Sequence, residues 1–166
     1  RDRGFLFDIE NLPYGSLTQN KKIEYPRYIS KVDIHCMPGG YTFESHSNDI
    51  YTGALYDRSL FLYAHGGLGI NNDEIGKSSC EWIKSNFPKL KPKNILDMGC
   101  SIGSNTIPYA NYFPETKVSA IDLSGPMLRY AYLRSNEYKQ SIHFSQQNAE
   151  KTDFTNDSFD IIVSHI

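Results

Sequence analysis

The sequence predicts an α/β protein organised around a doubly wound parallel sheet, and three observations support this prediction. Short apolar runs alternate with helical patterns throughout the second half of the chain, as expected for strands joined by crossover helices. A glycine-bearing turn, residues 99–103, follows the first of these runs. Two carboxylates, Asp97 and Asp122, stand at the ends of two successive runs. Because open α/β sheets bind ligands outside the carboxyl ends of their strands, we expect both acids at a binding crevice.

Residues 1–70 are expected to form a loop-rich, partly helical extension that caps the rest of the molecule. Proline and glycine interrupt the first fifty residues, which leaves room for one or two short strands or helices. A helix-compatible pattern follows at 48–64, and three of its aromatic side chains could face a ligand: Tyr51, Tyr56 and Tyr63. The glycine-rich segment 65–69 is interpreted as a hinge rather than an anion-binding nest, because it lacks the lysine and hydroxyl side chains of a phosphate loop.

Residues 71–166 are expected to form a partial sheet domain with four strands. The strands are placed at 95–98, 117–121, 142–146 and 159–164. The helices are placed at 72–87, 104–113 and 124–138.

Local signals support two of these helix starts. Asn72 can cap the first helix, with Asp73 and Glu74 near the positive end of its dipole. Ser124 can cap the last helix, with Pro126 in its first turn. Five side chains at helical spacing are expected to form the buried stripe of the first helix: Ile75, Ser79, Trp82, Ile83 and Phe87.

The composition limits the classes of protein to which this chain can belong. Its 166 residues carry a net charge of -2 and are 39% hydrophobic. No apolar run is long enough to span a bilayer, no secretion signal is visible, and no basic block favours nucleic acid or a membrane as a partner. The three cysteines, Cys36, Cys80 and Cys100, are widely spaced. Neither a disulfide framework nor a metal site is therefore expected, and a cytoplasmic location is predicted.

The chain begins without methionine and ends inside the last predicted strand. An apolar strand at the edge of a sheet normally needs a neighbour or a cover. We therefore expect either a fragment that is truncated after the fourth strand or self-association through the edge of that strand.

The chemistry of the glycine turn favours a cationic nucleoside over a dinucleotide. The dinucleotide fingerprint G-x-G-x-x-G requires a glycine where this chain has Ser101. Asp97 also places a negative charge beside the position of a pyrophosphate, which repels a dinucleotide and attracts an ammonium or sulfonium group. An NAD-dependent oxidoreductase is the weaker alternative.

Four segments, in this order, carry a resemblance to a known family. They are Ile95-Leu-Asp-Met-Gly-Cys-Ser-Ile-Gly103, Ala120-Ile-Asp-Leu-Ser-Gly-Pro-Met-Leu128, Gln147-Asn-Ala-Glu150 and Phe159-Asp-Ile-Ile-Val163. Together they resemble the class I S-adenosylmethionine-dependent methyltransferases, of the small-molecule type that includes quinone methylases. The resemblance implies a Rossmann-like fold, S-adenosylmethionine as the cofactor and S-adenosylhomocysteine as its product. It covers about 72–166 and says little about the first seventy residues.

The resemblance also implies a set of site residues. The methionine part of the cofactor would lie along Asp97 and the turn that contains Gly99, Cys100, Ser101 and Gly103. Asp122 would accept hydrogen bonds from both ribose hydroxyls. The adenine would lie between Leu123 and Met127, with its edge against Asn148, Ala149 and Glu150. Ser164 and His165 would sit beside the methyl group, and His165 is the possible catalytic base.

Several of these residues also have a structural interpretation that involves no ligand. Asp97 could cap the following helix or pair with a lysine, and Asp122 could cap the next helix alongside Ser124. Asn148 could be a turn residue and Glu150 a solvated charge. Cys100 is interpreted as a small packing residue rather than a nucleophile.

The expected function is S-adenosylmethionine-dependent methyl transfer to a small-molecule acceptor, or the cofactor-binding portion of such an enzyme. Transfer from a sulfonium mainly requires alignment and exclusion of water, so the acceptor cannot be inferred from the cofactor half. The alternative is a non-catalytic nucleoside-binding or interaction module with the same fold. Neither nucleic acid nor a membrane is an expected partner.

Overall fold

The computed structural model describes residues 9–32, 35 and 37–165. Its elements follow the chain in this order: η1 (Ile9–Asn11), β1 (Ser16–Thr18), α1 (Arg27–Ser30), α2 (Tyr51–Tyr63), α3 (Glu74–Asn86), β2 (Asn94–Met98), α4 (Thr106–Tyr112), β3 (Lys117–Asp122), α5 (Gly125–Glu137), β4 (Ile142–Gln146) and β5 (Ile161–Val163).

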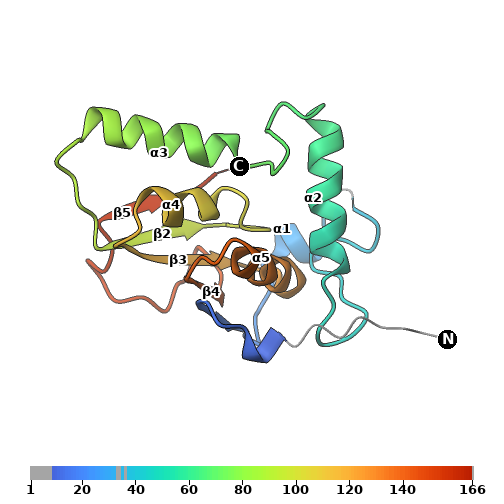
Figure 1. Ribbon diagram of the computed structural model, residues 1–166. Coiled ribbons are helices and arrows are strands. Elements are labelled where there is room, and N and C mark those ends of the chain that lie inside the picture. The colour runs from blue at the N-terminus through green and yellow to red at the C-terminus, as the bar shows by residue number, and fades with distance from the viewer. Residues whose placement is uncertain (1–8, 33–34, 36, 166) are drawn as a thin grey trace.

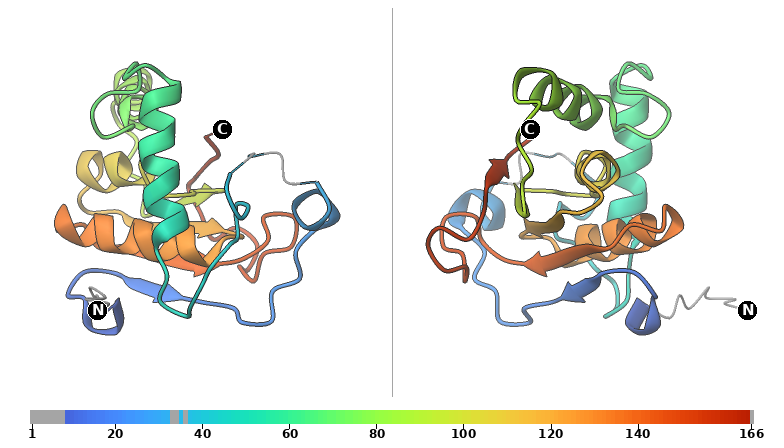
Figure 2. Two further views of the ribbon diagram at one scale, coloured as in Figure 1. Left: turned by 90° about the vertical axis from the view of Figure 1, so that its right-hand side faces the viewer. Right: turned by 60° about the vertical axis from the view of Figure 1, so that its left-hand side comes forward.

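The strands form one five-stranded sheet in which every pair is parallel, in the order β1-β4-β3-β2-β5 (Figure 1). The predicted α/β class is therefore confirmed, and the four predicted strands are all present. The chain moves from β2 through β3 to β4 and then returns past β2 to place β5 on its other side. Figure 2 shows α4 and α5, the two crossover helices, on the same face of the sheet. The reversal in strand order leaves the carboxyl end of β2 at the point where ligands bind in such sheets.

The strand β1 comes from the N-terminal extension and completes the other edge of the sheet. Ser16 lies opposite His143 of β4. Just before the strand, the Tyr14 N–H donates to Asn136 Oδ1, and Asn136 Nδ2 donates to the Tyr14 carbonyl, both at 2.9 Å. Gly15, between Tyr14 and Ser16 in the chain, has φ +72°. A Cβ at this position would lie 2.1 Å from the Ile142 carbonyl oxygen, so only glycine fits. The extension is thus built into the sheet through its first strand.

The core lies between the sheet and the helices α4 and α5. Its fully buried side chains come from the strands and from the inner faces of these helices, among them Ile95, Val118, Leu128, Ile142 and Phe144. The last five residues of β3 are all buried, which is typical of a strand inside a parallel sheet that is covered on both faces. The helix α5 begins as predicted, because the Ser124 hydroxyl accepts from the Met127 N–H and Pro126 lies in the first turn.

Two details of α3 were predicted wrongly. The residue at its N-cap is Asp73, whereas Asn72 has φ +54° and donates from Nδ2 to Asp57. The expected stripe is also not the buried face, since Trp82 is 60% and Phe87 52% exposed. The residues that α3 buries are the small ones, Gly76 and Cys80, although Ile83 packs partly against the core.

The reason is the close approach of α4. The Gly76 N–H donates to Asn105 Oδ1 at 2.9 Å, and a Cβ on Gly76 would come within 2.5 Å of the Asn105 carbonyl oxygen. Only a small residue can face α4 at that distance, so the larger side chains of α3 turn toward solvent.

In the part of the chain that the structure describes, no helix has both the length and the apolar character needed to cross a membrane. No group of three or more metal-ligating side chains is found within the same residues. Cys80 and Cys100 are buried free thiols, while Cys36 lies outside the described residues.

Candidate functional site

The two acids of the sequence motif lie on neighbouring strands. In the register of β2 and β3, Asp97 is opposite Ala120, and Asp122 is the last residue of β3. Both side chains are buried, with 1% of Asp97 and 5% of Asp122 exposed. Burial disfavours the ionised form of both groups, and the charge of Asp122 further disfavours ionisation of Asp97.

Asp97 has one carboxylate oxygen without a partner. Its Oδ2 accepts from the Thr106 hydroxyl at 2.6 Å, whereas no described group hydrogen-bonds to its buried Oδ1. Burial raises the pKa of Asp97 to about 6, Thr106 opposes this rise, and the nearby Asp122 adds to it. A buried acceptor without a donor is costly, so this oxygen is suited to a hydrogen-bonding or cationic group of a ligand.

Asp122 is held by three donors. Its Oδ2 accepts from the Ser101 N–H at 2.9 Å and from the Tyr41 hydroxyl at 3.1 Å, and its Oδ1 accepts from the Ser124 N–H at 2.8 Å. Burial raises the pKa of Asp122, and these hydrogen bonds oppose the rise. The carboxylate therefore braces both the glycine turn and the start of α5.

The glycine turn between the acids leaves open space in front of its backbone. Gly99 has φ +78°, and a Cβ added there would meet no atom within 4 Å. The N–H groups of Gly99 and Cys100 both donate to the Ile121 carbonyl, which ties the turn to β3. A ligand could therefore lie against the bare backbone at Gly99.

Two cavities meet at Gly99. One, of about 90 Å³, contains Asp97, and the other, of about 210 Å³, contains Asp122. Gly99 lines both. An elongated ligand that crosses this glycine can reach one acid with each end, which is the arrangement needed for a nucleoside with a charged tail.

The structure brings most of the predicted site residues to these two cavities. The cavity at Asp97 is also lined by Gly99, Cys100, Ser101 and His165. The cavity at Asp122 is also lined by Gly99, Leu123, Asn148 and Ala149.

The other predicted residues lie outside both cavities. A Cβ on Gly103 would lie 3.1 Å from Ala131, so this glycine fits against α5. Met127 is fully buried behind the site. Glu150 is exposed and lines a separate groove, and its N–H donates to Asn148 Oδ1. The Ser164 hydroxyl donates to the Met98 carbonyl, beside a groove that Trp82 also lines.

Four aromatic residues of the extension line these cavities, and three of them were given no role by the sequence. Tyr28, His35 and Tyr41 line the cavity at Asp122, and the rings of His35 and Tyr41 stack at 4.0 Å. Tyr56 lines the cavity at Asp97, whereas Tyr51 and Tyr63 are 52% and 85% exposed. No local pattern distinguishes Tyr41. The only signal near it is the Gly39-Gly40 turn, in which both glycines have positive φ.

His165 forms a pair with Tyr109 at the edge of the cavity that contains Asp97. The Tyr109 hydroxyl and His165 Nε2 are 3.0 Å apart. Burial lowers the pKa of His165, so the ring is neutral near pH 7 and can accept a proton.

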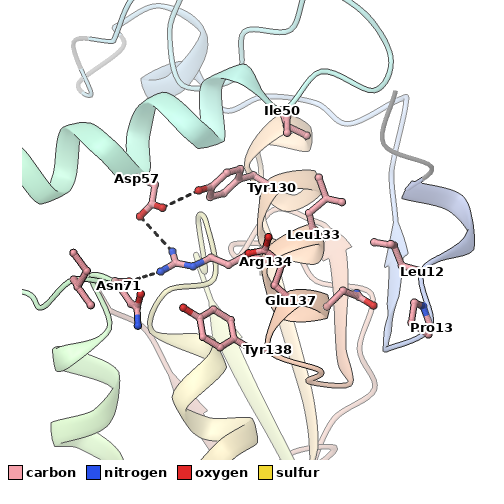
Figure 3. A pocket seen from close by; sticks show the side chains of 12 residues that line it. Leu12, Pro13, Ile50, Asp57, Asn71, Tyr130, Leu133, Arg134, Glu137 and Tyr138 are labelled. Atoms are coloured by element: carbon pink, nitrogen blue, oxygen red, sulfur yellow. Dashed lines mark hydrogen bonds and ion pairs between the residues drawn. The ribbon is translucent and has the colours of Figure 1, made fainter. Parts of the chain in front are cut away.

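A larger cavity of about 590 Å³ lies away from these acids, between the segment before β1, α2 and α5 (Figure 3). Its central charges, Asp57 and Arg134, pair with each other at 3.3 Å, and the Tyr130 hydroxyl donates to Asp57. Asp57 and Arg134 therefore neutralise each other at the centre of this cavity.

Comparison with known proteins agrees with the geometry. Residues 95–166 match the family model of the methyltransferase domain. The chain is 38% identical over 88 residues to release factor glutamine methyltransferase of Flavobacterium psychrophilum, covering 51% of this chain and 31% of that protein. It is 32% identical over 95 residues to malonyl-acyl-carrier-protein O-methyltransferase of Paenibacillus sp., covering 55% of this chain and 34% of that protein. The chain spans about a third of the length of these relatives.

A solved structure adds a match in three dimensions. Phosphoethanolamine N-methyltransferase 2 of Haemonchus contortus, in complex with S-adenosyl-L-methionine, is 28% identical with a TM-score of 0.51. The match covers 65% of this chain and 25% of that chain. Residues 95–166 therefore belong to the methyltransferase domain family and have the Rossmann-like fold of the class I S-adenosylmethionine-dependent methyltransferases.

Proposed function

We propose that this chain binds S-adenosylmethionine across Gly99 and serves in methyl transfer to a small-molecule acceptor. The observation that carries the proposal is at Asp97, which lines a cavity and whose buried Oδ1 has no hydrogen-bond partner among the described residues. The ammonium group of the cofactor supplies the missing donor, and its positive charge compensates the buried carboxylate. The matched relatives are named methyltransferases, which supports the same activity here.

Each part of the cofactor has a counterpart in the site. The amino-acid arm lies in the cavity at Asp97, the ribose hydroxyls bond to Asp122, and the adenine lies beside Leu123, Asn148 and Ala149. The backbone at Gly99 passes under the bond between the two parts, where a side chain would collide with the ligand.

The residues near His165 would serve the transfer itself. The cofactor supplies an activated methyl group, so the protein has to align the acceptor and exclude water. An acceptor that loses a proton as it is methylated needs a base. His165 is neutral near pH 7, lines the cavity at Asp97 and is oriented by Tyr109, so it is placed to take that proton.

Calorimetric titration with S-adenosylhomocysteine tests the cofactor assignment. Asp122→Ala removes the acceptor of the ribose hydroxyls, and hydrogen bonds to a charged group contribute about 1.5–3 kcal/mol each. Because both bonds are lost, we expect the affinity to fall by at least about 100-fold. Asp57→Asn, which alters a half-buried carboxylate away from the site, is the control and should bind normally. Unchanged affinity in Asp122→Ala, or binding of NAD in place of S-adenosylhomocysteine, contradicts the assignment.

Methyl transfer itself is measured as formation of S-adenosylhomocysteine from S-adenosylmethionine with a panel of small-molecule acceptors. Turnover with one of them supports an enzyme. Binding without turnover on the complete gene product favours the non-catalytic module.

A further inference from the structure

The hydroxyl of Tyr41 lies where a ribose hydroxyl would be expected. It donates to Asp122 Oδ2 at 3.1 Å, and both side chains are buried, with 6% of Tyr41 and 5% of Asp122 exposed. Tyr41 belongs to the extension, 81 residues before Asp122 in the chain. It also lines the cavity that contains Asp122, Leu123 and Asn148, so its side chain borders the space proposed for the nucleoside.

The hydrogen-bonding capacity of Asp122 is nearly filled. A carboxylate has about four acceptor positions, two on each oxygen. On Oδ2, the Ser101 N–H and the Tyr41 hydroxyl use both. On Oδ1, the Ser124 N–H uses one. A ribose diol that bonds to both oxygens needs one position on each, and the position on Oδ2 is available only if Tyr41 gives it up.

Several contacts hold Tyr41 in this position. The Ser124 hydroxyl donates to the Tyr41 carbonyl at 2.7 Å. The ring stacks on His35 at 4.0 Å and meets Tyr56 edge-on at 6.0 Å. Tyr41 therefore does not lie on Asp122 by chance, because its backbone, ring and hydroxyl each have a partner.

We propose that Tyr41 is a competitor built into the nucleoside site: its hydroxyl and a ribose hydroxyl contend for the same position on Asp122 Oδ2. The inference rests on the proposed function, since it takes the ligand to be a nucleoside. The affinity for any ligand with a ribose diol then includes the cost of displacing Tyr41. A ligand without the diol does not bear that cost.

The experiment compares two variants and two ligands. Tyr41→Phe keeps the ring and removes the hydroxyl. Tyr130→Phe is its matched control, because it removes a hydroxyl that donates to Asp57 at 2.8 Å, away from the site (Figure 3). The ligands are adenosine and 2′,3′-dideoxyadenosine, which differ only in the diol, and affinities are measured by calorimetry.

The proposal predicts that Tyr41→Phe binds adenosine about 2- to 10-fold more tightly than the wild type does, the range that follows from the net worth of one hydrogen bond. The affinity for dideoxyadenosine should stay the same, and Tyr130→Phe should change neither value. Weaker or unchanged binding of adenosine by Tyr41→Phe overturns the proposal. So does an equal change for both ligands, which would mean that the ring environment rather than the diol is affected.

Failure of the competition and failure of the proposed function give different results. If Asp122→Ala loses S-adenosylhomocysteine while Tyr41→Phe binds adenosine as the wild type does, the site assignment stands and the competition is wrong. If the wild type binds neither S-adenosylhomocysteine nor adenosine, both are wrong.

Discussion

Asp97 is the residue whose burial is hardest to explain without a ligand. Its carboxyl group sits in the interior with one oxygen unpaired, and burial raises its pKa from 3.8 to about 6. Such a group makes the folded protein bind a proton more tightly than the unfolded chain does. Its ionisation therefore lowers stability as the pH rises from about 4 to about 6 and keeps it lower above that range.

Replacing Asp97 by asparagine should remove this pH-dependent cost. The variant keeps an acceptor for Thr106 but cannot ionise. Two pKa units correspond to about 3 kcal/mol, so we expect Asp97→Asn to raise the free energy of unfolding by up to that amount at pH 7.5 and by much less at pH 4. Urea denaturation of both proteins at both pH values measures the difference. A variant that is less stable to the same degree at both pH values would show that ionisation is not the cost.

The site residues were predicted from the sequence where one short motif holds them together. Asp97 and the turn residues Gly99 and Ser101 lie within five positions of one another, so local backbone geometry determines their arrangement. Tyr41 could not be predicted in this way. Its contact with Asp122 spans 81 residues, and nothing in the sequence around it encodes that distance.

At the scale of elements, the start of α5 connects folding to the site. The Ser124 hydroxyl accepts from the Met127 N–H at 3.4 Å and donates to the Tyr41 carbonyl at 2.7 Å. One side chain thus caps the helix and fastens the extension to it. Both partners are backbone groups in the interior, where an unmade hydrogen bond is costly.

Ser124→Ala should therefore destabilise the protein by about 1–2 kcal/mol, the upper part of the range for loss of a helix cap. Ser135→Ala, in the last part of the same helix, serves as the comparison. Its hydroxyl donates to the Tyr132 carbonyl, which also accepts from Asn136 Nδ2, so no buried partner is left unpaired and the loss should be smaller, about 0.5–1 kcal/mol. Chemical denaturation gives both values. An equal decrease in the free energy of unfolding for the two variants would show that the capping hydroxyl stabilises the protein no more than the other hydroxyl does.

The strands and α3 show what periodicity can and cannot predict. The strand predicted at 142–146 has those bounds in the structure, where its residues alternate between buried and partly buried, as expected for a strand. The buried face of α3 was missed, because hydrophobicity does not report how closely a neighbouring helix approaches. Gly76 and Cys80 face the core for steric reasons, and no hydrophobic pattern would have selected them.

At the scale of the whole molecule, the extension contributes one strand to the sheet of the domain that follows it. The segment β1 has only three residues, too few for a recognisable alternation, yet it extends the sheet beside β4. Two hydrogen bonds between the Asn136 side chain and the Tyr14 backbone hold the chain just before this strand. The sequence predicts a cap over 1–70 with room for one or two short strands or helices, but it does not predict that one strand joins the sheet.

Asn136→Ala should loosen the extension, because it removes both hydrogen bonds to the Tyr14 backbone. We expect a loss of about 1–3 kcal/mol in stability and faster proteolysis of the chain before β1. Asn111→Ala removes an exposed hydrogen bond to Gln140 and should have little effect. Limited proteolysis followed by mass analysis locates the cut. Protection equal to that of the wild type would show that β1 is held by the sheet alone.

The raised pKa of Asp97 has a consequence for the binding of a charged ligand. With a pKa of about 6, Asp97 is partly protonated at mildly acidic pH, and a positively charged ligand that binds beside it displaces that proton into solvent. Near pH 6, binding then changes the acidity of the surrounding medium. The heat of binding would accordingly vary from one buffer to the next with the buffer's own ionisation enthalpy.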